Sequence, residues 1–288
     1  MNIPEDYIEF LHWVKEITET FWSKDPVPQE EGVSPEEWVR GAKWIGLEEE
    51  EIDAIEEKYQ IKFTKEHRAF LNILHTIDKK EPIECYDDND EVYYIEKSFF
   101  YNWKTDDDEL NYRFEWVFET ILQDVLGVNQ TWLKSWGKER PKSDDTKKEI
   151  FSNWLKQAPK LIPIHAHRFV VSEPSNSDNP VLSVCGSDII VYGWGMRHYL
   201  INELGGHLEL MYWEYDEEFD CWSVEPKEEL ENLYKLEYAT AKDKTIPFWE
   251  EMILYWSTGW SSFGRECPYH TKGEVDPIVS AFVAEDEE

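Results

Sequence analysis

Residues 44–71 read WIGLEEEEIDAIEEKYQIKFTKEHRAFL, and this stretch decides the fold. The four acids Glu48–Glu51 suit the first turn of a helix, where the positive end of the helix dipole stabilises negative charge. Thr64 suits the N-cap of a second helix. Between the helices, Ile61 and Phe63 alternate as a half-buried extended step. The apolar residues at helical spacing on either side are Ile52, Ile55, Tyr59, Phe70 and Leu71.

The sequence around this block predicts more helices and a group of strands. Apolar residues at spacings of three and four predict helices over residues 1–22 and 112–136. Alternating or β-branched runs predict strands at 92–95, 158–171, 181–184 and 189–193, and a hairpin around Asp216–Glu218. Because strands follow strands without intervening helices, we expect an antiparallel or mixed sheet in an α+β protein.

Composition limits the kinds of partner that the protein can have. The 288 residues include 62 acidic and 29 basic side chains, for a formal net charge of −33. A field of this sign repels phosphate backbones and anionic lipids, so neither nucleic acid nor a membrane is an expected partner. The same field attracts cationic proteins. Acidity that only keeps the protein soluble is the alternative explanation.

The cysteines and the N-terminal residues point to a reduced compartment. The four cysteines are widely spaced and include no Cys-x-x-Cys pair, which disfavours zinc ribbons and thioredoxin-like chemistry. Residues 1–10 carry acids where a signal peptide would carry Lys or Arg, and the chain has no 18-residue apolar run. We therefore expect a cytoplasmic protein.

Several motifs resemble the Smi1/Knr4 superfamily, whose members are also called SUKH domains. The pattern GL-x4-I-x3-E runs from Gly46 to Glu56, and I-x-F-x4-R-x-F-L continues from Ile61 to Leu71. Thr64 stands where that family often has proline, which leaves helix initiation intact. The bacterial branch is similar in LIPIHAHRF at 161–169, NPVLSV-x2-SDIIVYG at 179–193, Tyr199-Leu200-x2-Glu203, and IPFW at 246–249.

This resemblance, which covers residues 40–256, implies a fold and a function. The fold is α+β, with a strongly curved mixed or antiparallel sheet wrapped by helices. We expect an N-terminal helical extension and linker at 1–39, the Smi1/Knr4-like domain at 40–264, and a C-terminal tail at 265–288. Bacterial members are proposed immunity proteins that neutralise toxins, often nucleases, whereas fungal relatives are regulators. The resemblance supplies no catalytic residue.

Acids in predicted loops are the candidate partner-binding residues. An acidic face of this kind could imitate phosphates and block the basic cleft of a nuclease-like toxin. Neither Asp-rich cluster has the glycine and distal glutamate of an EF-hand, so we expect solvated loops and not calcium sites. The candidate residues are Asp87, Asp88, Asp90, Asp107, Asp108, Glu217 and Glu218.

Other chemistry is weakly supported by the sequence. His165 and His167 would share one side of a strand and could hold a metal, but further ligands are not evident. Ser187-Asp188 invites a hydrolase interpretation, yet no G-x-S-x-G elbow is present. The Trp-rich segment at 248–263 could stack a ligand, although such spacing is more typical of core. We therefore predict no metal, no cofactor and no catalytic residue.

The favoured function is a non-catalytic protein-binding module of the immunity type, directed at a basic, nuclease-like toxin. The alternative is an intracellular regulator or scaffold of the Smi1/Knr4 type, in which the acids only provide solubility. The sequence leaves the oligomeric state open.

Overall fold

A computed structural model describes residues 3–87, 89–127, 129–172, 179–241 and 243–256. The helices are α1 (Tyr7–Trp22), α2 (Glu49–Tyr59), α3 (Lys65–Ile73), α4 (Asp107–Leu126), α5 (Asp144–Leu155), α6 (Met196–Leu204), α7 (Glu228–Ala241) and α8 (Glu250–Tyr255), with 3₁₀ turns η1 (Glu37–Val39) and η2 (Lys134–Trp136). The strands are β1 (Trp44–Ile45), β2 (Thr76–Ile77), β3 (Lys80–Tyr86), β4 (Val92–Ser98), β5 (Lys160–His165), β6 (Arg168–Ser172), β7 (Val181–Cys185), β8 (Asp188–Gly193), β9 (Met211–Asp216) and β10 (Cys221–Pro226). The protein is therefore α+β, as predicted.

The largest sheet has four strands in the order β5-β6-β7-β8, and each neighbouring pair is antiparallel. Three further sheets, each a two-stranded antiparallel pair, join β1 to β2, β3 to β4 and β9 to β10. Two-residue turns at 166–167 and 186–187 link β5 to β6 and β7 to β8, which allows antiparallel pairing without a crossover helix. Of the two predicted alternatives, an antiparallel or a mixed sheet, the described strands form the antiparallel one.

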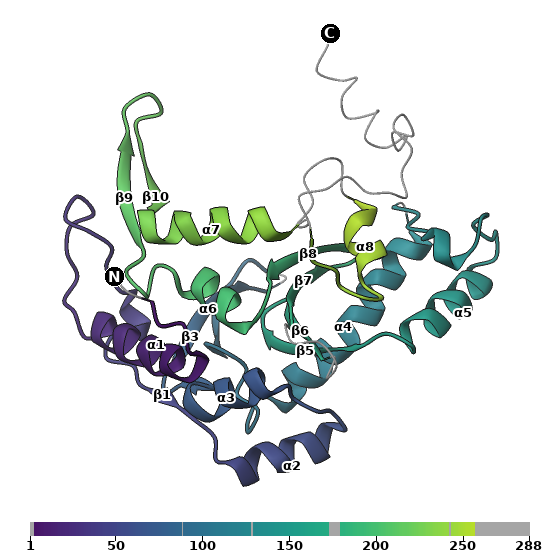
Figure 1. Ribbon diagram of the computed structural model, residues 1–288, viewed down its shortest axis with the longest axis horizontal. Helices are drawn as coiled ribbons and strands as arrows, with labels where there is room; N and C mark the ends of the chain where they lie inside the picture. The colour runs from purple at the N-terminus through teal and green to yellow at the C-terminus, as the bar shows by residue number, and fades with distance from the viewer. Residues whose placement is uncertain (1–2, 88, 128, 173–178, 242, 257–288) are drawn as a thin grey trace.

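Both faces of this sheet carry buried apolar side chains. Side chains alternate between the faces of a strand, and the alternation divides the apolar residues into two cores. Ile162 and Val170 belong to a core shared with α1, α2, α3 and α6. Leu161 and Phe169 belong to a second core with α4, α5 and α8. Figure 1 shows the sheet between these two groups of helices.

Residues 44–71 form the predicted pair of helices. Glu48 begins α2 with a capping box, in which its own N–H donates to Oε2 of Glu51 at 3.0 Å. Thr64 begins α3 by accepting the N–H of His67 at 3.2 Å. The predicted half-buried step is confirmed, because Ile61 and Phe63 are buried on either side of the exposed Lys62, in a connection that forms no strand.

Glu56 fixes the connection between α2 and α3 from within the core. Its Oε1 accepts the N–H of Phe63 at 2.8 Å, and its carboxylate pairs with Lys62 at 2.5 Å and Arg68 at 3.2 Å. Burial raises the pKa of Glu56, but these partners outweigh burial and the pKa is lowered. A buried charge is tolerated when it is paired and hydrogen-bonded in this way. Glu56, part of the family-like motif, is thus a structural residue.

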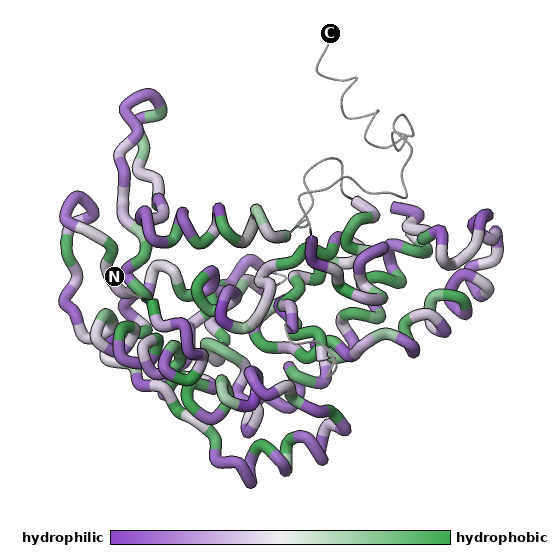
Figure 2. The backbone as a smooth tube through the Cα atoms, viewed as in Figure 1, coloured by the Kyte–Doolittle hydropathy of each residue, from purple (hydrophilic) through white to green (hydrophobic). Residues whose placement is uncertain are grey.

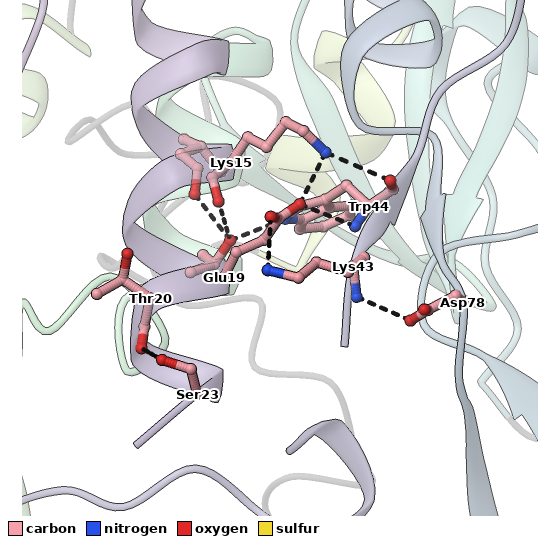
Figure 3. Close-up of polar contacts among 9 residues, drawn as sticks. Lys15, Glu19, Thr20, Ser23, Lys43, Trp44 and Asp78 are labelled. Carbon is pink, nitrogen blue, oxygen red and sulfur yellow. Dashed lines mark hydrogen bonds and ion pairs between the residues drawn. The ribbon is translucent and has the colours of Figure 1, made fainter. Parts of the chain in front are cut away.

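Helix α1, which lies in the predicted extension 1–39, packs on the first core through Phe10, Leu11 and Val14. Figure 3 shows how polar contacts fasten it to β1. Glu19 accepts from Lys15 at 2.7 Å, from Lys43 at 3.0 Å and from the N–H of Trp44 at 3.2 Å. Burial raises the pKa of Glu19, and these donors lower it below its usual value.

Glu19→Gln tests this fastening. The substitution keeps the shape and removes the charge that Lys15 and Lys43 share, so we expect the free energy of unfolding to fall by about 1–2 kcal/mol. Urea denaturation followed by circular dichroism measures the change. Glu16→Gln on the exposed face of the same helix is the matched control and should change stability by less than about 0.5 kcal/mol. Equal values for the two variants would contradict the structural role of Glu19.

The predicted domain boundaries at 39 and 264 stay a prediction, and the predicted tail 265–288 lies outside the described residues. Within the described ranges, no helix is both long enough and apolar enough to cross a lipid bilayer.

Candidate functional site: an acidic groove at the start of helix α4

The predicted partner-binding acids lie in three parts of the fold. Asp87 and Asp90 lie in the turn between β3 and β4, and Glu217 and Glu218 lie in the turn between β9 and β10. Asp107 and Asp108, which were predicted to lie in a loop, instead form the first turn of α4. Asp88 is outside the described residues.

Asp107 and Asp108 are the members of this set that line a groove. The groove has a volume of about 890 Å³ and lies between β3 and β4, the start of α4, and the β5–β6 turn at His165 and Ala166. Its other acids are Glu81, Glu96, Asp106 and Glu109, and its basic residues are Lys97 and Arg113. The groove therefore carries an excess of negative charge.

The acids at the start of α4 differ in what they contact. Asp106 accepts the N–H of Asn102 at 2.9 Å and so stabilises the loop before the helix. The Asp107 carboxylate accepts a hydrogen bond from the Tyr59 hydroxyl at 2.6 Å and forms an ion pair with Lys58. The Lys58 ammonium, together with this phenol, lowers the pKa of Asp107. Both aspartates thus have structural partners, and both benefit from the helix dipole.

Of the four remaining acids in the groove, Glu109 forms an ion pair and the other three do not pair with a described lysine or arginine. Glu109 pairs with Arg113 at 2.8 Å, and the Arg113 guanidinium lies 5.0 Å from the ring centre of Trp116. Among the described residues, no lysine or arginine pairs with Glu81, Glu96 or Asp108. Carboxylates without a cation, gathered in a concave surface, can bind ammonium or guanidinium groups and repel anions.

Sequence reasoning missed Glu81 and Glu96 because they are isolated acids in strands, not members of an acidic run. Glu81 and Glu96 do not face each other across the hairpin. In the β3–β4 register Glu81 faces Lys97, and Glu96 faces Pro82. The apolar run at 92–95 predicted one strand of this hairpin, but it gave no signal for the two acids. Which residues of α4 they approach depends on the tertiary fold.

The turn of the β3–β4 hairpin uses one predicted acid for its own structure. Asp87 Oδ1 accepts the N–H of Asn89 at 2.8 Å and that of Glu91 at 2.9 Å. The backbone N–H of Glu91 lowers the pKa of Asp87 most, and that of Asn89 lowers it further. Asp90 occupies the left-handed region with φ of 60°, a conformation that aspartate tolerates better than most residues. Asp87 therefore shapes the turn while staying exposed.

The predicted arrangement of His165 and His167 is wrong. His165 ends β5, whereas His167 lies in the turn before β6, so the two residues do not share one side of a strand. His165 Nδ1 lies 3.1 Å from Oε1 of Glu203. Burial raises the pKa of Glu203, but His165 and Arg168 outweigh it and the pKa is lowered. No group of three or more His, Cys, Asp or Glu within the described ranges could hold a metal ion.

Ser187, the serine of the hydrolase interpretation, is fully buried. Its hydroxyl donates to Asp124 at 2.7 Å, lies 2.8 Å from the hydroxyl of Thr131, and accepts from the indole of Trp256 at 3.0 Å. These bonds join the β7–β8 turn to α4 and to the residue after α8. A serine buried and bonded in this way stabilises the fold and cannot reach a substrate.

The Trp-rich segment at 248–263 is described only as far as Trp256. Within that part, Trp249 is fully buried in the second core. Its ring lies 5.6 Å from that of Trp154. This tryptophan therefore belongs to the core, as its spacing indicated.

Comparisons with known proteins identify no relative. No protein-family model matches the chain, and neither curated proteins nor solved structures include a significant match.

Proposed function

We propose that this protein is a non-catalytic protein-binding module that binds a basic partner through the acidic groove at the start of α4. The observation that supports this proposal is that Glu81, Glu96 and Asp108 line a groove of about 890 Å³. None of the three forms an ion pair with a lysine or arginine among the described residues. Carboxylates gathered in a concave surface without a cation attract ammonium and guanidinium groups, and a basic side chain of a partner supplies such a group.

In this proposal the partner is a nuclease-like toxin, and the protein acts as an immunity protein of the Smi1/Knr4 kind, with the curved sheet of that family. The motifs at 46–56 and 61–71 support the family assignment, and the net charge of −33 supports the sign of the partner. The groove presents carboxylates where the toxin would otherwise hold phosphates. The overall field speeds the encounter at low salt.

Neutralising the unpaired groove acids tests the binding site. The triple variant Glu81→Gln, Glu96→Gln, Asp108→Asn removes three charges that no described cation pairs. We expect a fluorescein-labelled 14-residue peptide of alternating arginine and serine to bind this variant about tenfold more weakly than the wild type in 50 mM salt, since each exposed charge pair contributes about 0.2–1 kcal/mol. Fluorescence anisotropy measures the dissociation constants.

The matched control is the triple variant Glu16→Gln, Glu30→Gln, Glu31→Gln, which changes the net charge equally at exposed sites away from the groove. It should weaken binding less than twofold. Equal weakening by both triple variants would mean that net charge alone attracts the peptide. Affinity that does not change between 50 and 300 mM salt would remove the electrostatic mechanism.

The adjacent coding sequence tests the immunity role. We expect it to encode a toxin with a basic nuclease domain, whose activity this protein inhibits in a purified assay and the groove variant inhibits less. A basic neighbour that keeps full nuclease activity in the presence of the protein would contradict the immunity role and favour a regulator or scaffold.

A further inference from the structure

The β9–β10 hairpin is set apart from both cores. Its strands pair with each other from Met211↔Pro226 to Asp216↔Cys221, and no other described strand pairs with either of them. Figure 1 shows the hairpin standing out from the body near the start of α7. Of its strand residues, Met211 at the base packs against a core. A lone two-stranded hairpin is marginally stable in water, and beyond Met211 none of the described strand residues of this hairpin packs against either core.

One face of the hairpin is aromatic. Side chains alternate along each strand, which places Trp213 and Tyr215 on the same face as their cross-strand partners Val224 and Trp222. The rings of Tyr215 and Trp222 have centres 5.2 Å apart. Such cross-strand pairs stabilise a hairpin, and they leave the outer surfaces of these rings uncovered by the described residues: Tyr215 and Val224 are exposed, and the two tryptophans are partly exposed.

The tip presents an apolar side chain in a defined turn. The carboxylate of Asp216 accepts the N–H of Glu218 at 2.8 Å and that of Phe219 at 3.2 Å. Phe219 is 72% exposed, the highest value for any large apolar side chain among the described residues. A preorganised turn that holds a phenylalanine in solvent fits the central anchor of a protein interface, where aromatic side chains enter a partner's pocket.

The acids around these rings have no cations. Glu214, Glu217, Glu218 and Glu225 form no ion pair with a lysine or arginine among the described residues. Figure 2 shows that the tip is largely hydrophilic around its apolar residue. Aromatic rings interleaved with carboxylates form a surface that suits guanidinium groups, which stack on the rings and pair with the acids.

Elsewhere in this protein, arginine side chains occupy sites made of an aromatic ring and a carboxylate. Arg168 stacks on Tyr192, with the guanidinium 3.9 Å from the ring centre, and lies 4.0 Å from the carboxylate of Glu203. Arg113 likewise lies over the ring of Trp116 and forms an ion pair with Glu109. In the hairpin the rings and the acids are present without an arginine from the described residues.

We infer that the β9–β10 hairpin is an insertion element that enters an apolar, arginine-lined pocket of a protein partner. Phe219 fills the apolar part of the pocket, while the rings of Tyr215 and Trp222 stack against guanidinium groups that pair with the flanking acids. This inference rests on the proposed function, because the partner is the same basic protein. It adds a contact that does not use the groove and that supplies apolar specificity as well as charge.

Two peptides of equal charge test the inference. Both are fluorescein-labelled and 14 residues long; one alternates arginine with leucine, and the other alternates arginine with serine. We expect Phe219→Ser to weaken binding of the arginine–leucine peptide about tenfold and binding of the arginine–serine peptide less than twofold. Trp222→Thr should weaken both, because its ring stacks on arginine in either peptide. Anisotropy titrations measure the affinities.

Leu236→Ser on α7 is the matched control, because Leu236 is 61% exposed and carries a similar apolar area outside the hairpin. It should leave both affinities unchanged. Because Phe219 is exposed, Phe219→Ser should keep the thermal midpoint of the wild type, which separates lost binding from unfolding.

The outcomes separate this inference from the proposed function. If Phe219→Ser binds both peptides like the wild type while the groove variant weakens both, the inference is overturned and the proposed function stands. If the wild type binds neither peptide, both are overturned. A wild-type dimer in sedimentation that Phe219→Ser converts to a monomer would also overturn the inference, because a second copy would then occupy the hairpin.

Discussion

Gly46→Ala is expected to lower the free energy of unfolding by about 3 kcal/mol or more, because it forces a side chain into backbone. A Cβ at Gly46 would lie 1.9 Å from the carbonyl oxygen of Asn72 and 2.9 Å from its carbonyl carbon. The two backbones approach this closely because Leu47 donates its N–H to Leu71 at 2.9 Å. The side chain of Asn72 also donates to the carbonyl of Leu47 at 2.9 Å.

Relief of this clash requires α3 to separate from the residues after β1. Both hydrogen bonds would then lengthen, and the start of α2 would lose its support from α3. Thermal and urea denaturation measure the effect. Gly206→Ala is the control, since nothing lies within 4 Å of its added Cβ, and it should change stability by less than about 1 kcal/mol. Similar stability of the two variants would show that the backbones can separate without loss.

Acid is expected to destabilise the protein well above the pH at which carboxylates titrate. Burial lowers the pKa of His67 to about 3 and that of His75 to about 4. In the unfolded chain each has a pKa of about 6.5. Between these values the unfolded state binds more protons than the folded state, so stability is full above about pH 6.5 and falls as pH decreases towards 4.

The two histidines together should remove about 4 kcal/mol of stability between pH 7 and pH 5, at up to about 1.4 kcal/mol per pH unit for each. A loss of this size is a large part of the 5–15 kcal/mol that is typical of a domain. Urea midpoints at pH 7, 6 and 5 measure it. A stability that is constant over this range would contradict the burial of neutral histidines.

His67→Leu isolates one of the two contributions. Both ring nitrogens of His67 are buried and have no hydrogen-bond partner among the described residues, so an apolar side chain of similar volume loses no bond there. We expect about half of the pH-dependent loss to disappear, with stability at pH 7 close to that of the wild type. His12→Leu, at an exposed position, should leave the pH dependence unchanged. His75 is less suitable, because its Nε2 accepts the N–H of Trp103 at 3.0 Å.

Much of the local structure followed from residues close together in sequence. Glu48–Glu51 and Thr64 begin helices as predicted, because capping and dipole interactions act within one turn. The strands at 181–184 and 189–193 were also predictable from short apolar runs. The half-buried step at Ile61 and Phe63 was predictable as well, since apolar residues on either side of a lysine place one side of an extended segment in the core.

The site was less predictable than the fold. Asp107 and Asp108 were predicted as partner-binding residues because they lie in a run of acids. Asp107 already pairs with Lys58 and accepts a hydrogen bond from Tyr59. Glu81 and Glu96 carry no signal of their own and become part of the groove only because their hairpin lies beside the start of α4. The sequence shows how many charged residues the protein has, whereas the ion-pair partners of each charge come from residues distant along the chain.

The amino-acid sequence by itself determined the starts of α2 and α3, the succession of strands without intervening helices and the sign of the net charge. These features depend on neighbours within a few residues or on composition alone. The close approach at Gly46, the burial of Glu56 and His67, the unpaired acids of the groove and the exposed Phe219 depended on the tertiary structure. The physical reason is that burial and pairing are properties of contacts between distant segments, which packing of the two cores brings together.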